Sequence, residues 1–276
     1  MNVIKLSAPA IKEFWEIPVL FEDEHFLALD KPAGLLVSPD RYKPELPNLM
    51  QLLHEGIAAN KPWAASRGLS YLANTHRLDA DTSGVLLLAR NKPALVAVAN
   101  LFSSNKPAQK FFALTSGLPS SDRFVMDAKI TTSVAELGMM RIDNRDGMKS
   151  KTEFDVVEKF SGYTTLSCHP LTHRNHQIRI HLKHAGFPVV GDHLYGGKPL
   201  WLSNLKKDFY LKRGREERSL MARVALHSEQ LAFTHPVTGE TITINAPIPK
   251  DLRVALRYLR EFRGSGRGAG SVSDQD

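Results

Sequence analysis

The residues best suited to chemistry form a polar segment at positions 76–84. Two carboxylates, Asp79 and Asp81, follow Arg77 in this segment, and residues 85–89 directly after it are all apolar. A short apolar run bounded by turn residues is typical of a buried strand. A carboxylate held at the edge of the buried core is suited to catalysis, and a neighbouring arginine would keep it ionised. The alternative is an Asp-rich turn that carries only a surface ion pair.

A second group of candidate residues lies at positions 169–184, where five histidines accompany Arg174 and Arg179. The histidine spacing raises the possibility of a metal site, but the only flanking acidic or thiol ligands are Cys168 and Asp192. A catalytic zinc site usually draws on three positioned ligands. We therefore expect no metal, and we expect the histidines to lie on the surface or at the end of a helix.

Apolar patterning predicts the elements that must position these residues. Short β-type runs predict strands at 17–21, 26–29, 85–89, 110–114, 130–132, 153–157 and 164–168. Apolar residues at helical spacing predict helices at 47–58, 92–102 and 177–185. A last helix is expected to begin at Asp251 as its capping residue, and residues 59–70 are expected to form a loop.

Composition limits the class of protein. The chain has 276 residues, 42% of them hydrophobic, which is enough for a large core. Its net charge of +7 is consistent with a polyanionic partner. One cysteine, Cys168, permits no intrachain disulfide. With no apolar stretch of 18 residues or more, we expect a soluble, cytoplasmic protein without membrane contact.

Two blocks of sequence resemble the RluA-type pseudouridine synthases, which modify RNA. The first block is His76-Arg77-Leu78-Asp79 followed by Thr82-Ser83-Gly84. The second comprises Arg174, His176-Gln177-Ile178-Arg179, His181-Leu182, Gly191-Asp192 and Tyr195-Gly196. A Lys-Pro-x-Gly segment at residues 31–34 also matches a turn that lies near the active site in this family, and the resemblance extends over residues 17–260.

The resemblance implies a fold, a reaction and roles for particular residues. The fold would be α+β, with a large mixed, mainly antiparallel sheet and a central cleft flanked by helices. The reaction would convert uridine to pseudouridine in structured RNA, ribosomal or transfer, without metal or cofactor. The implied site residues are Asp79 as nucleophile or base, Arg179 as its ion-pair partner, Phe112 stacking on uracil, Arg77 filling the gap left by the flipped nucleotide, and Arg174 and His176 contacting RNA.

At two positions the chain departs from the family pattern. Phe112 stands where most members carry a tyrosine, so that a stacking role survives but a phenolic hydrogen bond does not. His173 replaces the glycine before Arg174. If that glycine provides a positive φ angle, the loop around His173 should be reshaped.

Residues 1–263 are expected to form one catalytic domain without the S4 module that some members carry, and the protein is expected to be a monomer. Residues 264–276, rich in Gly and Ser, are expected to form a disordered tail. The expected partner is RNA and not DNA. Two alternatives remain: an RNA-binding protein that has lost catalysis, which would not need the Asp79–Arg179 pair, and a glycosidase, for which Asp81 is the nearest second carboxylate.

Overall fold

The computed structural model describes residues 2–40, 44–212 and 214–264. The tail that the sequence predicts to be disordered therefore lies, from residue 265 onward, outside the described residues. Within them, no helix is both long and apolar enough to cross a membrane.

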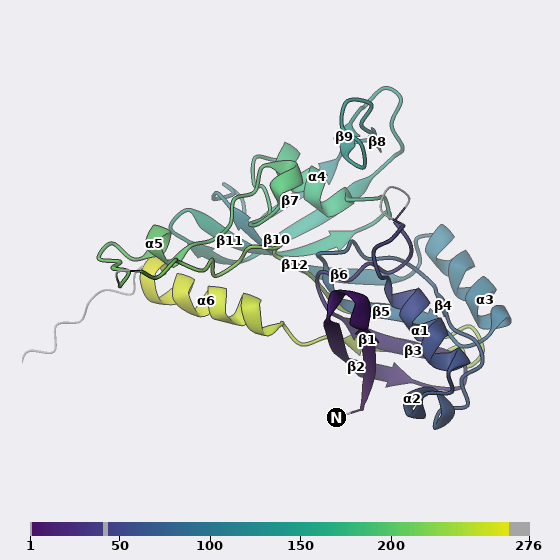
Figure 1. The fold of residues 1–276 in the computed structure, drawn as a ribbon. Coiled ribbons are helices and arrows are strands. Elements are labelled where there is room, and N and C mark those ends of the chain that lie inside the picture. Colours follow the sequence, from purple (N-terminus) through teal and green to yellow (C-terminus); the bar gives the residue numbers. More distant parts are fainter. Residues whose placement is uncertain (1, 41–43, 213, 265–276) are drawn as a thin grey trace, which may run out of the picture.

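One large curved sheet runs through the molecule (Figure 1). Its strands are β1 (Val3–Ala8), β2 (Glu13–Glu22), β3 (Phe26–Lys31), β4 (Ala73–Asn74), β5 (Ser83–Ala89), β6 (Ala108–Ser116), β7 (Arg123–Asp127), β10 (Lys151–Phe160), β11 (Tyr163–Pro170), β12 (Leu226–Thr234) and β13 (Thr241–Asn245). The strand order is β1-β2-β3-β5-β12-β6-β11-β10-β7, with β4 beside β5 and β13 beside β12. Among the paired strands of the described chain, β5 and β12 are parallel and the others are antiparallel, so the sheet is mixed and mainly antiparallel.

A separate hairpin and a set of helices complete the fold. The hairpin consists of β8 (Ile130–Thr132) and β9 (Met140–Ile142). The helices are α1 (Leu49–Ala58), α2 (Pro62–Ala65), α3 (Lys92–Ser103), α4 (Gln177–His184), α5 (Leu202–Leu205) and α6 (Lys250–Arg263), with 3-10 turns η1 (Pro9–Ile11) and η2 (His193–Tyr195). In Figure 1, α4 lies above the sheet and α6 below it, and the hairpin projects beyond α4.

The central strand β5 is buried along its whole length. Its side chains alternate between two hydrophobic core clusters, one on each face of the sheet. Leu86 and Leu88 face the cluster that contains α1, whereas Val85 and Leu87 face the cluster that contains α3. Both faces of this strand are therefore covered by helices, which explains why its sequence is a continuous apolar run and not an alternating one.

Three expectations about the elements need correction. The family resemblance also matches residues 223–227 and 231–233 to a pair of closing strands, but residues 226–227 and 231–233 belong to the single strand β12, and its hairpin partner is β13. Asp251 does not cap α6, because Pro249 occupies that position and the Asp251 carboxylate lies in the first turn. Residues 59–70 are not all loop, since they contain α2.

Candidate active site

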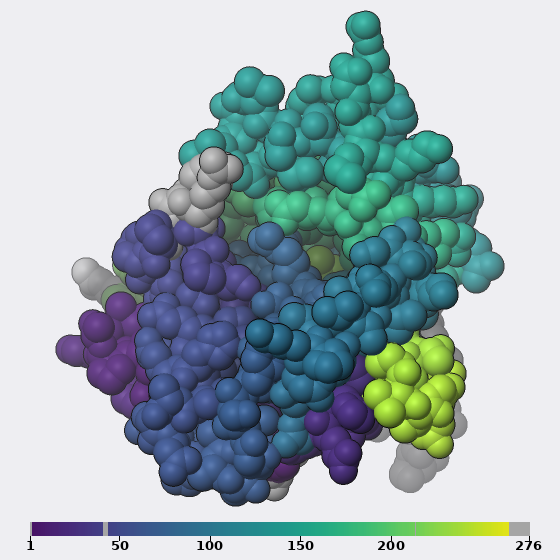
Figure 2. Space-filling model, turned by 90° about the vertical axis from the view of Figure 1, so that its right-hand side faces the viewer, coloured from purple at the N-terminus to yellow at the C-terminus, as the bar shows by residue number. Residues whose placement is uncertain are grey.

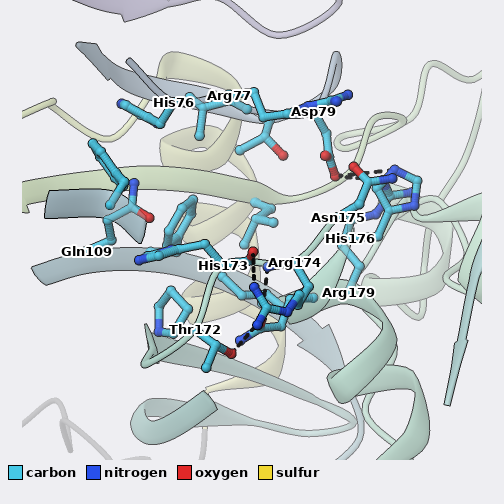
Figure 3. Close-up of a pocket in the computed structure, with 18 of the residues that line it drawn as sticks. His76, Arg77, Asp79, Gln109, Thr172, His173, Arg174, Asn175, His176 and Arg179 are labelled. Carbon is cyan, nitrogen blue, oxygen red and sulfur yellow. Dashed lines mark hydrogen bonds and ion pairs between the residues drawn. The ribbon is translucent and has the colours of Figure 1, made fainter. Parts of the chain in front are cut away.

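A cavity of about 570 Å³ opens beside the polar segment before β5. In Figure 2 the surface is hollowed between the blue lower part of the molecule and the teal and green upper part. The cavity is lined by residues that include Thr75, His76, Arg77, Asp79, Phe102, Asn105, Gln109, Phe111, Thr172, His173, Arg174, His176 and Arg179. The two sequence blocks singled out above therefore form opposite walls of one site (Figure 3).

The loop that carries Asp79 is fixed from below by a buried lysine. The side chain of Lys31 is inaccessible to solvent, and its Nζ donates to the carbonyl oxygens of Pro32, Leu35 and Ala80 at 2.7–2.9 Å. The amide of Gly34 donates to the Ala80 carbonyl as well. The Lys-Pro-x-Gly turn thus acts as an anchor for the residue after Asp79, a role that its local sequence alone did not reveal.

The same loop is fixed from its other end by the close approach of β12. Gly84 has a φ of +110°, and a Cβ atom built on it would lie 2.1 Å from the carbonyl oxygen of Ser228. No other residue fits there without displacing β12. Ser83 adds a buried hydrogen bond of 2.9 Å to Nδ1 of His227. The Ser83-Gly84 sequence before the apolar run is therefore explained by strand packing.

Arg179 connects Asp79 to a second carboxylate. Its Nη1 donates to Oδ2 of Asp79 at 2.8 Å, while Nε and Nη2 donate to the two oxygens of Asp192 at 2.7 and 2.8 Å. Asp192 is completely buried, and the Asp79 side chain retains 19% exposure. The expected Asp79–Arg179 pair is present, and the role of Asp192 as the residue that orients Arg179 was missed.

This arrangement keeps Asp79 ionised. Burial by itself raises the pKa of a carboxyl group, but the positive charges of His176, when its imidazole is protonated, and of Arg179 more than offset it, so the pKa of Asp79 lies below its usual value. Burial also lowers the pKa of His176, which Asp79 only partly counteracts, and the imidazole is therefore expected to be neutral.

A hydrogen-bonded chain fixes the orientation of His176. The backbone amide of Met140, on β9, donates to the hydroxyl of Tyr195 at 2.9 Å, and this hydroxyl lies 2.8 Å from Nδ1 of His176. The hydroxyl accepts the amide hydrogen, so it can donate its own hydrogen to Nδ1. Nε2 of a neutral His176 then carries the proton and faces Oδ2 of Asp79 at 3.8 Å.

Tyr195 also supports Arg179 directly, since the guanidinium carbon lies 5.0 Å from the centre of the tyrosine ring. Such a cation–π contact adds to the ion pairs in holding the guanidinium plane. The sequence comparison had matched Tyr195 as part of a motif without giving it a role.

The loop at residues 172–176 is organised by Gln177, the first residue of α4. Its Oε1 accepts hydrogen bonds from the hydroxyl of Thr172 and the amide of Arg174, and its Nε2 donates to the carbonyl of Lys151 and the hydroxyl of Thr152. Arg174 and His176 are thereby placed on the cavity wall.

Phe112, the residue expected to stack on uracil, does not line the cavity, whereas its neighbour Phe111 does. Successive residues of β6 point to opposite faces of the sheet, and Gln109 and Phe111 share the face that looks into the site. Both rings are buried, at 7% and 9% exposure, so burial alone does not distinguish them.

His173 does not take a positive φ angle: the non-glycine residues of the described chain that do are Lys12, Asn60, Asn105 and His176. The replacement of the family glycine thus adds an imidazole to the cavity wall without a strained backbone at that position.

The histidines of this region are not all on the surface. His181 is fully buried, with Nδ1 2.9 Å from the hydroxyl of Thr152 and Nε2 3.2 Å from the carbonyl of Ala128. Among the described residues, no cluster of three or more histidine, cysteine or acidic side chains is arranged to hold a metal ion.

Comparisons with known proteins identify the family to which this fold belongs. Residues 25–184 match the family model of the RNA pseudouridylate synthases. A protein of Xanthomonas campestris named ribosomal large subunit pseudouridine synthase D is 35% identical over 261 residues, covering 94% of this chain and 74% of that protein. Ribosomal large subunit pseudouridine synthase C of Escherichia coli K12 is 32% identical over 247 residues, covering 89% and 70%.

Solved structures show the same fold. Human RNA pseudouridylate synthase domain containing 4 superimposes with a TM-score of 0.68 at 24% identity, covering 88% of this chain and 92% of that one. The chain therefore belongs to the RNA pseudouridylate synthase family. It is an RNA-modifying isomerase that converts uridine to pseudouridine.

Proposed function

We propose that Asp79 performs this isomerisation as nucleophile or base at the ribose of the target uridine. The observation that carries the proposal is the ion pair of 2.8 Å between Arg179 and Asp79 at the cavity. Asp192 accepts hydrogen bonds from the same guanidinium and holds it in place. A carboxylate with a lowered pKa is charged and ready to react at neutral pH.

The reaction itself explains why the site is a pocket. The bond between C1′ and N1 breaks, the uracil turns, a bond forms between C1′ and C5, and the proton of C5 is lost while N1 gains one. Atoms balance within the nucleotide, so that no cofactor is needed. The detached uracil must be retained throughout, and a concave site that buries most of its ligand meets this requirement.

Other residues of the cavity are proposed to hold the nucleotide. Phe111 stacks on the uracil in place of Phe112, since base stacking on an aromatic ring is worth about 1–3 kcal/mol. Arg77 is exposed at the cavity and fills the gap left in the RNA by the extruded nucleotide. Arg174 and His176 contact the RNA from the opposite wall.

Large-subunit ribosomal RNA is the substrate class we propose, with transfer RNA as the competing class. Support comes from the relatives named as ribosomal large subunit synthases C and D. The net charge of +7 is consistent with an RNA partner. We propose further that the protein acts in the cytoplasm as a monomer.

The proposal is tested by tritium release from ribosomal and transfer RNA transcripts labelled at C5 of uracil. The unmodified protein should release tritium from the ribosomal transcript. Asp79→Asn should release none and still bind the RNA, because the amide keeps the shape of the side chain but cannot act as nucleophile or base.

Asp81→Asn is the matched control. Asp81 lies two residues away, is exposed and is not among the residues that line the cavity. Asp81→Asn should retain tritium release. The substitution also removes the second carboxylate that a glycosidase would need. Tritium release by Asp79→Asn, or loss of RNA binding together with turnover, would count against a catalytic Asp79.

We do not propose the alternative function, an RNA-binding protein without catalysis. No specific observation favours it, because Asp79 and Arg179 remain paired at the cavity. RNA binding by the unmodified protein without tritium release from either RNA class would support it.

A further inference from the structure

The cavity extends well beyond the ion pair, and its other end carries aromatic rings. Figure 3 shows Asp79, His176 and Arg179 at one end and His76 and Gln109 at the other. Phe102, at the end of α3, also lines the cavity. Neither Phe102 nor the rings beside it have a part in the proposed chemistry at Asp79.

Phe102 contacts two imidazole rings at this second end. His76 stacks on Phe102 with 5.0 Å between ring centres and an interplanar angle of 26°. His173 meets Phe102 edge-on, at 5.7 Å and 71°. All three side chains line the cavity and are only partly buried, so that part of each ring stays accessible to a ligand.

Polar groups beside these rings have no protein partner. Within the part of the chain that the structure describes, Nε2 of His173 and Nε of Arg174 are buried and make no hydrogen bond. A buried polar atom without a partner costs free energy, which a ligand can recover by bonding to it. Both atoms belong to residues that line the cavity.

The imidazole rings are suited to a nucleobase better than to a phosphate. Burial lowers the pKa of His76 to about 3, and burial together with Arg174 lowers the pKa of His173, so that both rings are neutral. The ring of His76 is also fixed in its plane, since its Nε2 accepts the amide hydrogen of Leu87 at 3.1 Å. Flat neutral rings offer stacking surfaces, whereas the adjacent guanidinium of Arg174 offers charge to a phosphate.

We propose that His76, Phe102 and His173 form a second base-binding subsite, which takes the nucleobase next to the target uridine in the RNA chain. This inference rests on the proposed function, because it takes the uridine to lie at Asp79. Nε2 of His173 bonds to an edge of the neighbouring base, and Arg174 meets the phosphate between the two nucleotides. Since His173 replaces the glycine of the family motif, the subsite gives this chain a preference for its own sequence context.

The test uses short RNA that contains the target uridine, with 2-aminopurine in place of the base on either side. The RNA is the ribosomal fragment that releases tritium or, failing release, the fragment that binds most tightly. The fluorescence of 2-aminopurine is quenched when the base stacks on an aromatic ring. The unmodified protein should quench it at one of the two positions, and His173→Gly should reduce this quenching and bind the RNA about tenfold more weakly.

Further variants separate stacking from folding. His173→Phe should keep the quenching because it keeps the ring, whereas Phe102→Leu should lose it while retaining apolar bulk. His184→Ala is the matched control, since His184 is an exposed histidine of α4 that does not line the cavity. RNA with an abasic ribose at the quenched position should bind the unmodified protein and His173→Gly equally.

Equal quenching by the unmodified protein and His173→Gly would overturn the subsite. So would an affinity difference that persists with the abasic RNA, because His173 would then act on the protein structure and not on the base. Quenching that depends on His173 without any tritium release would instead keep the subsite and refute the proposed function, so the two failures are distinguishable.

Discussion

Arg179 is shared unequally between two carboxylates, and this inequality suits their different tasks. Asp192 is fully buried and takes two of the guanidinium hydrogen bonds, whereas Asp79 takes one through Oδ2. Bidentate pairing fixes the plane of an arginine. Asp192 can therefore hold the guanidinium in place, while Asp79 keeps lone pairs for the substrate.

The lowered pKa of Asp79 predicts how activity depends on pH. In the proposed reaction the reactive form of Asp79 is the carboxylate, and so kcat/KM should stay level from about pH 8 down to about pH 5 and fall only near or below the usual carboxyl pKa of about 3.9. In Arg179→Met the ion pair is lost and burial raises the pKa, which moves the acid limb of the profile to higher pH. Rates of tritium release between about pH 3 and pH 8 measure both profiles; an unshifted limb in Arg179→Met would contradict the assignment.

Tyr195→Phe tests the hydrogen-bonded chain behind His176. The change removes the hydroxyl that links the Met140 amide to Nδ1 of His176. A lost hydrogen bond with a partner left unsatisfied costs about 1–3 kcal/mol of stability. We also expect single-turnover tritium release to slow by about tenfold or more, because small misplacements in a site are costly. Tyr163→Phe, half-buried and outside the cavity, is the control, and unchanged turnover in Tyr195→Phe would exclude a positioning role.

The central strands determine where the polar loop can lie. β5 pairs in parallel with β12 at Ser83 and Gly84, directly after the loop, and β3 ends at Lys31 beneath it. On the opposite wall, α4 begins next to His176 and carries Arg179 within its first turn. The catalytic geometry is thus set by the ends of three elements, which are rigid supports compared with free loops.

Lys31→Met should show how much of this geometry depends on the buried ammonium group. The carbonyls of Pro32, Leu35 and Ala80 would lose their donor. We expect the free energy of unfolding to fall by about 1–3 kcal/mol, and activity to fall at temperatures at which the variant is still folded. Urea unfolding and tritium release measure the two effects. Lys92→Met, at an exposed position at the start of α3, should change neither, and a fully active Lys31→Met would contradict the anchoring role.

Across the whole molecule, the β8–β9 hairpin extends the wall of the cleft away from the sheet (Figures 1 and 2). It is joined to the site through Met140, which contacts Tyr195, and through the small apolar cluster of Ile130, Ile180 and Tyr195. Arg145 and Lys149, just after β9, are exposed. This placement would let the same segment contact phosphates and support His176.

Replacing both exposed cations, Arg145→Gln with Lys149→Gln, should reduce the salt dependence of RNA binding. Each lost phosphate contact lowers the slope of log K against log salt concentration by about 0.7–0.9, so the pair should lower it by about 1.4–1.8. Filter binding at several salt concentrations measures the slope. Lys250→Gln with Arg257→Gln, exposed on α6 below the sheet, is the control pair. Equal slopes for the unmodified protein and the hairpin variant would exclude contact at these positions.

Local sequence determined many of the elements and the candidate residues of this protein. The apolar run of β5, the helical spacing in α1, α3 and α4, and the two charged blocks could all be read from neighbouring residues. Such patterns depend on the short-range geometry of the backbone, which has a period of 2 in strands and 3.6 in helices.

Only the tertiary structure decided which of those residues meet. Residues 111–114 are all apolar because β6 is buried, so the sequence could not show that Phe111 and not Phe112 faces the site. The contact of Lys31 with the Ala80 carbonyl and the relay from Met140 to His176 join segments that are distant in the chain. They depend on which strands become neighbours in the sheet, and that choice is made by packing of the whole core, which no local pattern records.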